Sequence, residues 1–253
     1  MQRKTGAWFI GGALLVFGTM IASGAEQPHW GYAGNVGPEH WGALAPAYER
    51  CASGRNQSPI DLKGFVAANL KPIRFHYATN AMEVHNNGHT VQANYTPGST
   101  IELDGHVFEL KQFHFHAPSE NRISSKIFPL EGHLVHADSA GNLAVVSVMF
   151  VEGKANATVA TLWKQMPSEE GEKVALTSEV NAAGLLPKKR AYYRYNGSLT
   201  TPPCSEGVWW LVLKEPVSVS QQQVEAFTKV MGHPNNRPVQ AVNARSILQP
   251  RSK

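Results

Sequence analysis

The stretch QFHFH at residues 112–116 decides how the rest of the chain is interpreted. Successive side chains of a β-strand point to opposite faces, so His114 and His116 project side by side while the phenylalanines beside them pack on the other face. A second alternating stretch, EGHLVH at residues 131–136, places His133 17 residues after His116. If the two strands are neighbours, three imidazoles meet on one face of a sheet.

Three histidines with a fourth position left for water are the ligand set of a catalytic zinc site. Gln112 and Glu131 precede His114 and His133 by two residues and share their strand faces. Each can accept a hydrogen bond from the ring nitrogen that does not bind metal, which orients the ring. The alternatives are separate core or surface histidines and, for Glu131, an ordinary cross-strand charge. The polar neighbours favour a metal site made by all three histidines.

The remaining sequence predicts a strand-rich chain. Apolar and polar residues alternate with a period of two, as in half-buried strands, at residues 82–85, 90–93 and 107–110. Denser apolar runs at residues 143–151 and 208–213 predict buried central strands.

Helical spacing is confined to residues 155–165 and 220–230, and Ser220 is a suitable N-cap for the second of these helices. Long loops are expected at residues 118–130 and 194–206, which makes both loops candidates for function.

Length and composition are those of an ordinary globular protein. The chain has 253 residues, of which 42% are hydrophobic and 17% charged, and it contains no internal repeat or linker. A chain of this length buries a large core without metal, so a zinc ion would serve chemistry rather than stability. The net charge of +4 falls to +2 without Arg3 and Lys4. Because no basic block is interleaved with aromatic residues, we expect no nucleic-acid binding, and residues 188–190 are interpreted as a solvated turn.

The first 25 residues have the three-part pattern of a secretory signal peptide. A basic start is followed by an uncharged, mostly apolar run at residues 7–21 and by the small residues ASGA at 22–25. The run is short for a bilayer span, although an uncleaved anchor is the alternative. We therefore predict cleavage after Gly24 or Ala25, a mature domain at residues 26–253 with no membrane span, and export, to the periplasm in a Gram-negative host and otherwise to the medium.

Cys51 and Cys204 are the only two cysteines. An even count in an exported protein favours a disulfide, with two free buried thiols as the alternative. Closing a loop of about 150 residues would contribute roughly 4–5 kcal/mol in the chain-entropy model. Neither cysteine belongs to a C-x-x-C pair, so a zinc role is not expected for them.

Further motifs surround the two histidine stretches and continue along nearly the whole mature chain. They are HWGY at residues 29–32, QSPIDL at 57–62, NGH at 87–89, SE at 119–120, LAV at 143–145, GSLTTPP at 197–203 and NRP at 236–238. In this order they resemble the alpha-class carbonic anhydrases, a family that is itself the standard example of a three-histidine zinc site. The position of the cysteines resembles the exported bacterial type.

The resemblance implies a mainly β, single-domain fold with a large twisted, mostly antiparallel ten-stranded central sheet and a few peripheral short helices. It implies one Zn²⁺ per chain, bound by His114, His116 and His133 at the bottom of a conical cleft. The implied reaction is the reversible hydration of carbon dioxide to bicarbonate and a proton, by zinc-bound hydroxide attack with a histidine proton shuttle. Such an enzyme is a carbon-oxygen lyase, and sulfonamides and anions are its expected inhibitors.

The resemblance also implies individual roles. Thr200 would accept a hydrogen bond from the hydroxide, Glu120 would receive the Thr200 hydroxyl proton, and His89 would be the proton shuttle. The other positions that match the family's site are an apolar wall for carbon dioxide (Val135, Val145, Leu199 and Trp210), Thr201 beside the bicarbonate, and Tyr32, Asn87 and Gln92 around the intervening waters. Taken alone, these residues are ordinary core, loop and turn positions.

Two other functions are compatible with such a fold. A non-catalytic binding protein is disfavoured because the three ligand histidines, Thr200, Glu120 and His89 are all present. A zinc-dependent esterase or hydrolase is the second alternative, since the same hydroxide would hydrolyse esters weakly.

Overall fold

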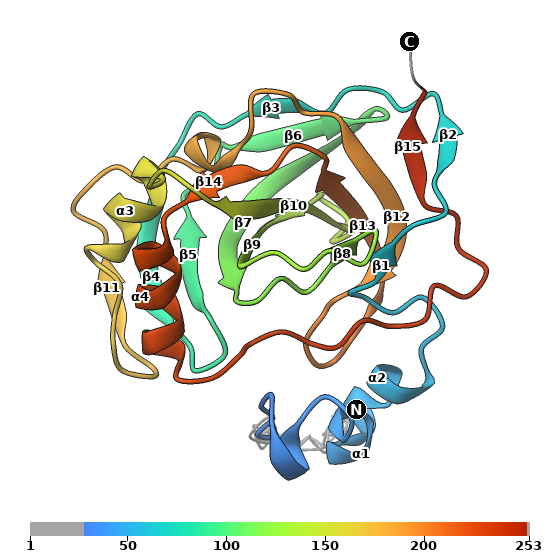
Figure 1. Cartoon of the computed structure of the whole chain (residues 1–253), viewed down its shortest axis with the longest axis horizontal. Coiled ribbons are helices and arrows are strands. Elements are labelled where there is room, and N and C mark those ends of the chain that lie inside the picture. The colour runs from blue at the N-terminus through green and yellow to red at the C-terminus, as the bar shows by residue number, and fades with distance from the viewer. Residues whose placement is uncertain (1–27, 252–253) are drawn as a thin grey trace, which may run out of the picture.

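A large mixed β-sheet dominates the computed structural model, which describes residues 28–251 (Figure 1). The predicted signal peptide lies outside these residues. Ten strands form one continuous path in the order β11-β4-β5-β7-β9-β10-β13-β12-β15-β2, and β3, β6 and β14 join it from the side. The path contains β2 (Val66–Ala68), β4 (Ala81–Asn86), β5 (Val91–Tyr95), β7 (His106–His116), β9 (Leu130–Ala137), β10 (Leu143–Glu152), β11 (Lys173–Ala175), β12 (Tyr192–Ser198), β13 (Glu206–Leu213) and β15 (Leu248–Pro250).

The remaining elements are short. The side strands are β3 (Arg74–His76), β6 (Thr100–Leu103) and β14 (Val217–Val219), and a separate two-stranded sheet consists of β1 (Asp61–Leu62) and β8 (Arg122–Ile123). The helices are α1 (Trp41–Leu44), α2 (Arg50–Ser53), α3 (Ala157–Trp163) and α4 (Gln221–Met231), with 3-10 turns at Gly34–Val36, Pro46–Tyr48 and Ala182–Leu185.

The predicted fold class is confirmed, and the sheet has three strands more than expected. Most strand pairs are antiparallel, and within this sheet the exceptions are β10 with β13, β10 with β14, and β15 with β2. The strand at the centre, β10, is buried along most of its length, which fits its nearly continuous apolar sequence.

Helices α3 and α4 cover one face of the sheet together (Figure 1). Phe115 of β7 packs edge-on against Trp163 of α3, and Trp163 stacks on Phe227 of α4. Helix α4 begins after Ser220, which forms a capping box with Gln223, so the predicted N-cap is confirmed. Helix α3 is shorter than predicted at both ends, because Asn156 caps its start and the helix ends at Trp163.

Strand β7 joins two alternating runs that the sequence presents as separate. The pairing with β9 skips Lys111, which is the extra residue of a β-bulge. Phe108 and Leu110 before the bulge therefore lie in the same core as Phe113 and Phe115 after it. The opposite face is left to His114 and its neighbours.

The expected loop at residues 194–206 is partly wrong. Residues 194–198 belong to β12, because Arg194 pairs with Leu211 and the pairing continues to Ser198. Only the segment between β12 and β13 is a loop. The expected loop at 118–130 is correct apart from the short strand β8 and its last residue, Leu130, which begins β9.

Two further predictions have a structural counterpart. Cys51 and Cys204 form a disulfide, which confirms the predicted pairing. Residues 188–190 are exposed. Within residues 28–251, no helix combines the length and the apolar character that crossing a membrane requires.

Candidate metal centre and active site

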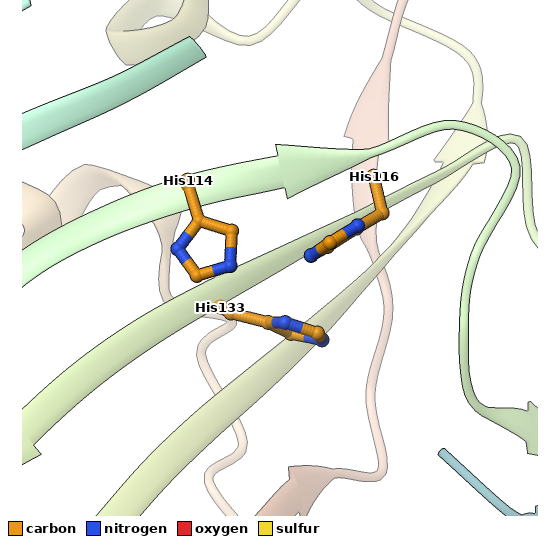
Figure 2. Close-up of side chains that lie close together, drawn as sticks. All are labelled: His114, His116 and His133. Atoms are coloured by element: carbon orange, nitrogen blue, oxygen red, sulfur yellow. The ribbon is translucent and has the colours of Figure 1, made fainter. Parts of the chain in front are cut away.

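The three histidines of the predicted metal site lie together on one face of the sheet. Strands β7 and β9 are antiparallel neighbours, and their register sets His114 opposite His133. His116 follows two residues after His114 on the same face, so the three rings point toward one another (Figure 2). One nitrogen from each ring can be chosen so that all three atoms lie within 4.8 Å of one another.

Two of the rings are held by the polar residues that precede them by two positions. His114 donates from Nδ1 to Gln112 Oε1 at 2.8 Å, and His133 donates from Nε2 to Glu131 Oε1 at 2.8 Å. These oxygens act only as acceptors, so the proton sits on the bonded nitrogen. The lone pair is therefore left on His114 Nε2 and His133 Nδ1.

The third ring has a partner that sequence reasoning missed. His116 donates from Nδ1 to the backbone carbonyl of Asn235 at 2.7 Å. A main-chain acceptor more than one hundred residues away has no signature in the sequence. His116 Nε2 is buried and, among residues 28–251, has no hydrogen-bond partner. A buried acceptor nitrogen left unpaired beside two others is what a bound cation would satisfy, so the residues fit a zinc ion.

Burial also favours the neutral form of His114 and His116, the form that binds a metal. It lowers the pKa of His114 well below the usual value, and the neighbouring His116 and His133 lower it further. Burial lowers the pKa of His116 as well.

Glu131 is a fully buried carboxylate with many hydrogen-bond donors. Its oxygens accept from His133, from the backbone of Glu120, from the backbone and side chain of Asn121, and from the Ser147 hydroxyl. Burial raises its pKa, but His133 and these hydrogen bonds outweigh burial and lower the pKa to about 2. The group that holds the His133 ring is therefore ionised.

Glu120 lies beside His116 and His133, with one oxygen bound and one oxygen open. Its Oε1 accepts from the backbone N–H of Arg237 at 2.8 Å. Its Oε2 has no hydrogen-bond partner in the described chain and lies 3.6 Å from His116 Nε2 and 3.9 Å from His133 Nδ1. Burial raises the pKa of Glu120 to about 7, against the lowering effects of His133 and of a hydrogen bond from Thr200.

A cleft of about 120 Å³ opens beside the histidines. Its lining contains eight of the residues selected from the sequence, together with Trp30 and Thr90: Tyr32, Asn87, His89, Gln92, Gln112, His114, His116 and Thr201. His89 stacks on Trp30 with ring centroids 3.7 Å apart and planes inclined by 9°. Burial lowers the pKa of His89, while Glu170 raises it.

The polar residues predicted around the waters differ in whether their side chains already have hydrogen-bond partners within the protein. Asn87 Oδ1 accepts from the backbone N–H groups of His89 and Thr90, so it shapes the turn that carries His89. Gln92 donates to Asn94. The hydroxyl of Tyr32 is buried and has no partner in the described part of the chain, and burial raises its pKa well above the usual value.

The four residues predicted as an apolar wall form one patch. The register aligns Val135, Val145 and Trp210 across β9, β10 and β13, in the row next to His133. Leu199 packs on the same cluster. The edge of the Trp210 ring meets the His133 ring with centroids 4.9 Å apart. The cluster of three histidines therefore has a polar side toward His89 and an apolar side toward Trp210.

Comparisons with known proteins agree with this geometry. The model of the eukaryotic-type carbonic anhydrase family matches residues 36–251. A carbonic anhydrase of Pectobacterium carotovorum is 47% identical over 236 residues, which are 93% of this chain and 97% of the relative. A carbonic anhydrase of Neisseria gonorrhoeae is 45% identical and covers 90% of each chain.

Solved structures give the same result. The alpha-carbonic anhydrase of Thermovibrio ammonificans, solved with the inhibitor sulfanilamide, superimposes with a TM-score of 0.87 at 50% identity, covering 88% of this chain and all of the other. A structure of dioscorin complexed with ascorbate has a TM-score of 0.83 at 31% identity and covers 89% of this chain and 100% of the other. With a family model matched over nearly all the described residues and relatives above 40% identity, the chain belongs to the eukaryotic-type, or alpha, carbonic anhydrase family.

Proposed function

We propose that this chain is an exported zinc enzyme that catalyses the reversible hydration of carbon dioxide to bicarbonate and a proton. The observation that carries the proposal is the set of three buried imidazoles whose acceptor nitrogens converge beside Glu120 and an apolar patch. Family membership agrees with this reaction.

One zinc ion per chain would be held by Nε2 of His114, Nε2 of His116 and Nδ1 of His133. When bound, zinc lowers the pKa of its water to about 7 and so supplies hydroxide at neutral pH, a value known from carbonic anhydrases themselves. Neutral imidazoles suit this chemistry because they leave the full +2 charge of the metal uncompensated, whereas thiolates or carboxylates would offset it.

Thr200 and Glu120 orient the attacking oxygen. A hydroxyl that donates its proton to Glu120 can only accept at its remaining lone pairs, so Thr200 accepts from the nucleophile and directs the nucleophile's free lone pair toward the substrate. This role requires ionised Glu120. The positive charge of the occupied site, next to Oε2, favours the ionised form.

Carbon dioxide binds on one side of the centre, and the proton leaves on the other side. Carbon dioxide is small and apolar, so it binds against Val135, Val145, Leu199 and Trp210, with Thr201 beside the bicarbonate product. The proton leaves through water toward His89, aided by Tyr32, Asn87 and Gln92. Imidazole suits this transfer because its pKa lies near that of the group it deprotonates.

The activity is tested by stopped-flow measurement of carbon dioxide hydration on the purified mature protein, with and without a zinc chelator or a sulfonamide. We expect rapid hydration that either reagent abolishes. His114→Ala should lose zinc and activity while remaining folded, whereas His76→Ala, at an exposed histidine on β3, should keep both.

Three outcomes would contradict the proposal. A fully active zinc-free His114→Ala protein would exclude the metal site. Ester turnover that exceeds carbon dioxide hydration would favour a hydrolase. A folded wild-type protein that has neither zinc nor activity would favour a non-catalytic binding role. Export is tested separately by the mass of the protein secreted by its host, which should begin at Ala25 or Glu26.

A further inference from the structure

The buried side chain of Asn235 joins the metal centre to the turn that carries His89. It is fully buried, and its Nδ2 donates to the backbone carbonyls of His89 at 3.0 Å and Phe115 at 2.9 Å. Its Oδ1 accepts from the backbone N–H of Ala117 at 2.9 Å, while its own carbonyl accepts from the His116 ring. With the backbone bond from its own N–H to the Ala117 carbonyl, five hydrogen bonds connect this one residue to both sides of the site.

The chemistry of these bonds requires a primary amide. Both Nδ2 protons are used by carbonyl acceptors, and Oδ1 is used by an N–H donor. An amide supplies two donors and an acceptor at this spacing, whereas a carboxylate supplies no donor and would face two carbonyl oxygens. The side chain is thus held in one orientation.

Two residues tie the His89 turn to β7. The Thr90 hydroxyl donates to the Phe115 carbonyl at 2.6 Å and accepts from the Phe115 N–H at 3.3 Å, and Asn235 binds the carbonyl of His89. Among residues 28–251, Asn87 bonds within the turn: its side chain accepts from the N–H groups of His89 and Thr90, and its own N–H donates to the Thr90 carbonyl. The preceding Asn86 bonds to residues 167–172, and its side-chain oxygen accepts from Gly88 within the turn. Among the described residues, the hydrogen bond that holds the His89 carbonyl itself comes from Asn235.

We propose that Asn235 is a positioning residue for proton transfer, a role that rests on the proposed function of the site. Its side chain fixes the His89 turn to the end of β7, the strand that carries two metal ligands. Its main-chain carbonyl accepts the hydrogen bond that orients the His116 ring. Asn235 therefore acts with Thr90 to set the separation between the shuttle and the metal centre, and of these two side chains it is Asn235 that bonds to His89 itself.

The two tasks of Asn235 are separable because they use different atoms. A side-chain substitution removes the bonds to His89, Phe115 and Ala117, and it leaves the carbonyl that accepts from His116. Proton transfer through a positioned group depends steeply on geometry, and a displacement of about 1 Å can cost roughly 100-fold in rate. We therefore expect Asn235→Ala to impair proton release while zinc binding survives.

The test compares Asn235→Ala with wild type, with His89→Ala and with Asn156→Ala. Asn156 is a buried amide that caps α3 and bonds to Gly184, so its loss controls for general destabilisation. In dilute buffer, turnover of Asn235→Ala should fall by about tenfold or more, and saturating imidazole should restore it to within about twofold of wild type, as for His89→Ala. The interconversion of carbon dioxide and bicarbonate at chemical equilibrium, which needs no net proton release, should change by less than about twofold.

A readout independent of activity is the NMR signal of the His89 ring, which the stacked Trp30 ring shifts. In Asn235→Ala this shift should be reduced, with one zinc per chain retained. Asn156→Ala should match wild type in both measurements.

A folded Asn235→Ala protein with an unchanged His89 signal and unchanged buffer dependence would overturn the inference. If that variant does not fold, Asn235→Ser is used, since its single hydroxyl cannot bond to both carbonyls, and the same two readouts decide. If wild type has no carbon dioxide hydration, the proposed function fails, whereas the His89 signal still reports whether Asn235 holds the turn.

Discussion

Each of the three clustered histidines uses its two ring nitrogens for different purposes. One nitrogen donates to a fixed acceptor, and this leaves the other with its lone pair directed at the centre. Two of the acceptors, Gln112 and Glu131, could be found from the sequence because a strand brings residues i and i+2 to one face. The third acceptor, the carbonyl of Asn235, could not, because every residue type has such a group.

His136 shows how the same rule separates a ligand from a core histidine. It lies an odd number of residues from His133 and therefore on the opposite face of β9, where it is fully buried. Its Nε2 lies 2.8 Å from the Tyr77 hydroxyl, and its Nδ1 lies 3.3 Å from the carbonyl of Ala144. Burial lowers its pKa from 6.5 to about 3, against the raising effect of the hydrogen bonds.

This shift predicts a contribution of His136 to acid unfolding. Between pH 6.5 and about 3 the unfolded chain protonates His136 and the folded chain does not, so the free energy of unfolding falls as the pH falls. The slope from this group is at most about 1.4 kcal/mol per pH unit. The free energy of unfolding of zinc-free protein, measured with denaturant at several pH values in this range, should depend less steeply on pH for His136→Gln than for wild type. Equal slopes in the two proteins would contradict the assignment.

At the scale of elements, β7 is the strand on which the site depends. Sequence alternation indicates two separate runs, at 107–110 and 113–116, because the phase changes between them. The structure resolves the phase change as a bulge at Lys111, which keeps the apolar residues of both runs in one core. The same bulge directs His114 and His116 away from that core.

Deleting Lys111 should therefore abolish the metal site. Without the extra residue, the end of β7 must either exchange its faces or lose its pairing with β9, because side chains alternate with a period of two. We expect zinc stoichiometry near zero and a lower midpoint of thermal unfolding. Lys111→Ala, which keeps the residue count, serves as the control and should bind one zinc per chain. A deletion variant that binds zinc normally would show that the bulge does not set the faces.

At the scale of the whole molecule, the disulfide joins two distant parts of the cleft. Cys51 follows the segment that carries Trp30 and Tyr32, and Cys204 lies in the loop between β12 and β13 that also carries Thr200. The two cysteines pack in one cluster with Trp41. The segment with α1 and α2, which lies below the sheet in Figure 1, is thereby held against the site loop.

Reduction of this disulfide should destabilise the protein markedly. The bond spans 153 residues, and closing a loop of about this length contributes roughly 4–5 kcal/mol in the chain-entropy model. Denaturant unfolding with and without reductant measures the difference. A variant with serine at both cysteines should resemble the reduced wild type, and its stability should not respond to reductant. A wild type that reductant leaves unchanged would contradict a stabilising role.

The sequence by itself determined the strand-rich class, the face shared by His114 and His116, two of the three ring partners and, through ordered motifs, the family. These follow from local rules, since alternation, caps and motif order are properties of neighbouring residues. Tertiary structure alone decided that β7 and β9 are in register, that a bulge at Lys111 separates core from site, and that residues 194–198 are strand. It alone brought Asn235 to His116 and His89, because contacts between distant segments depend on how the whole sheet closes around its core.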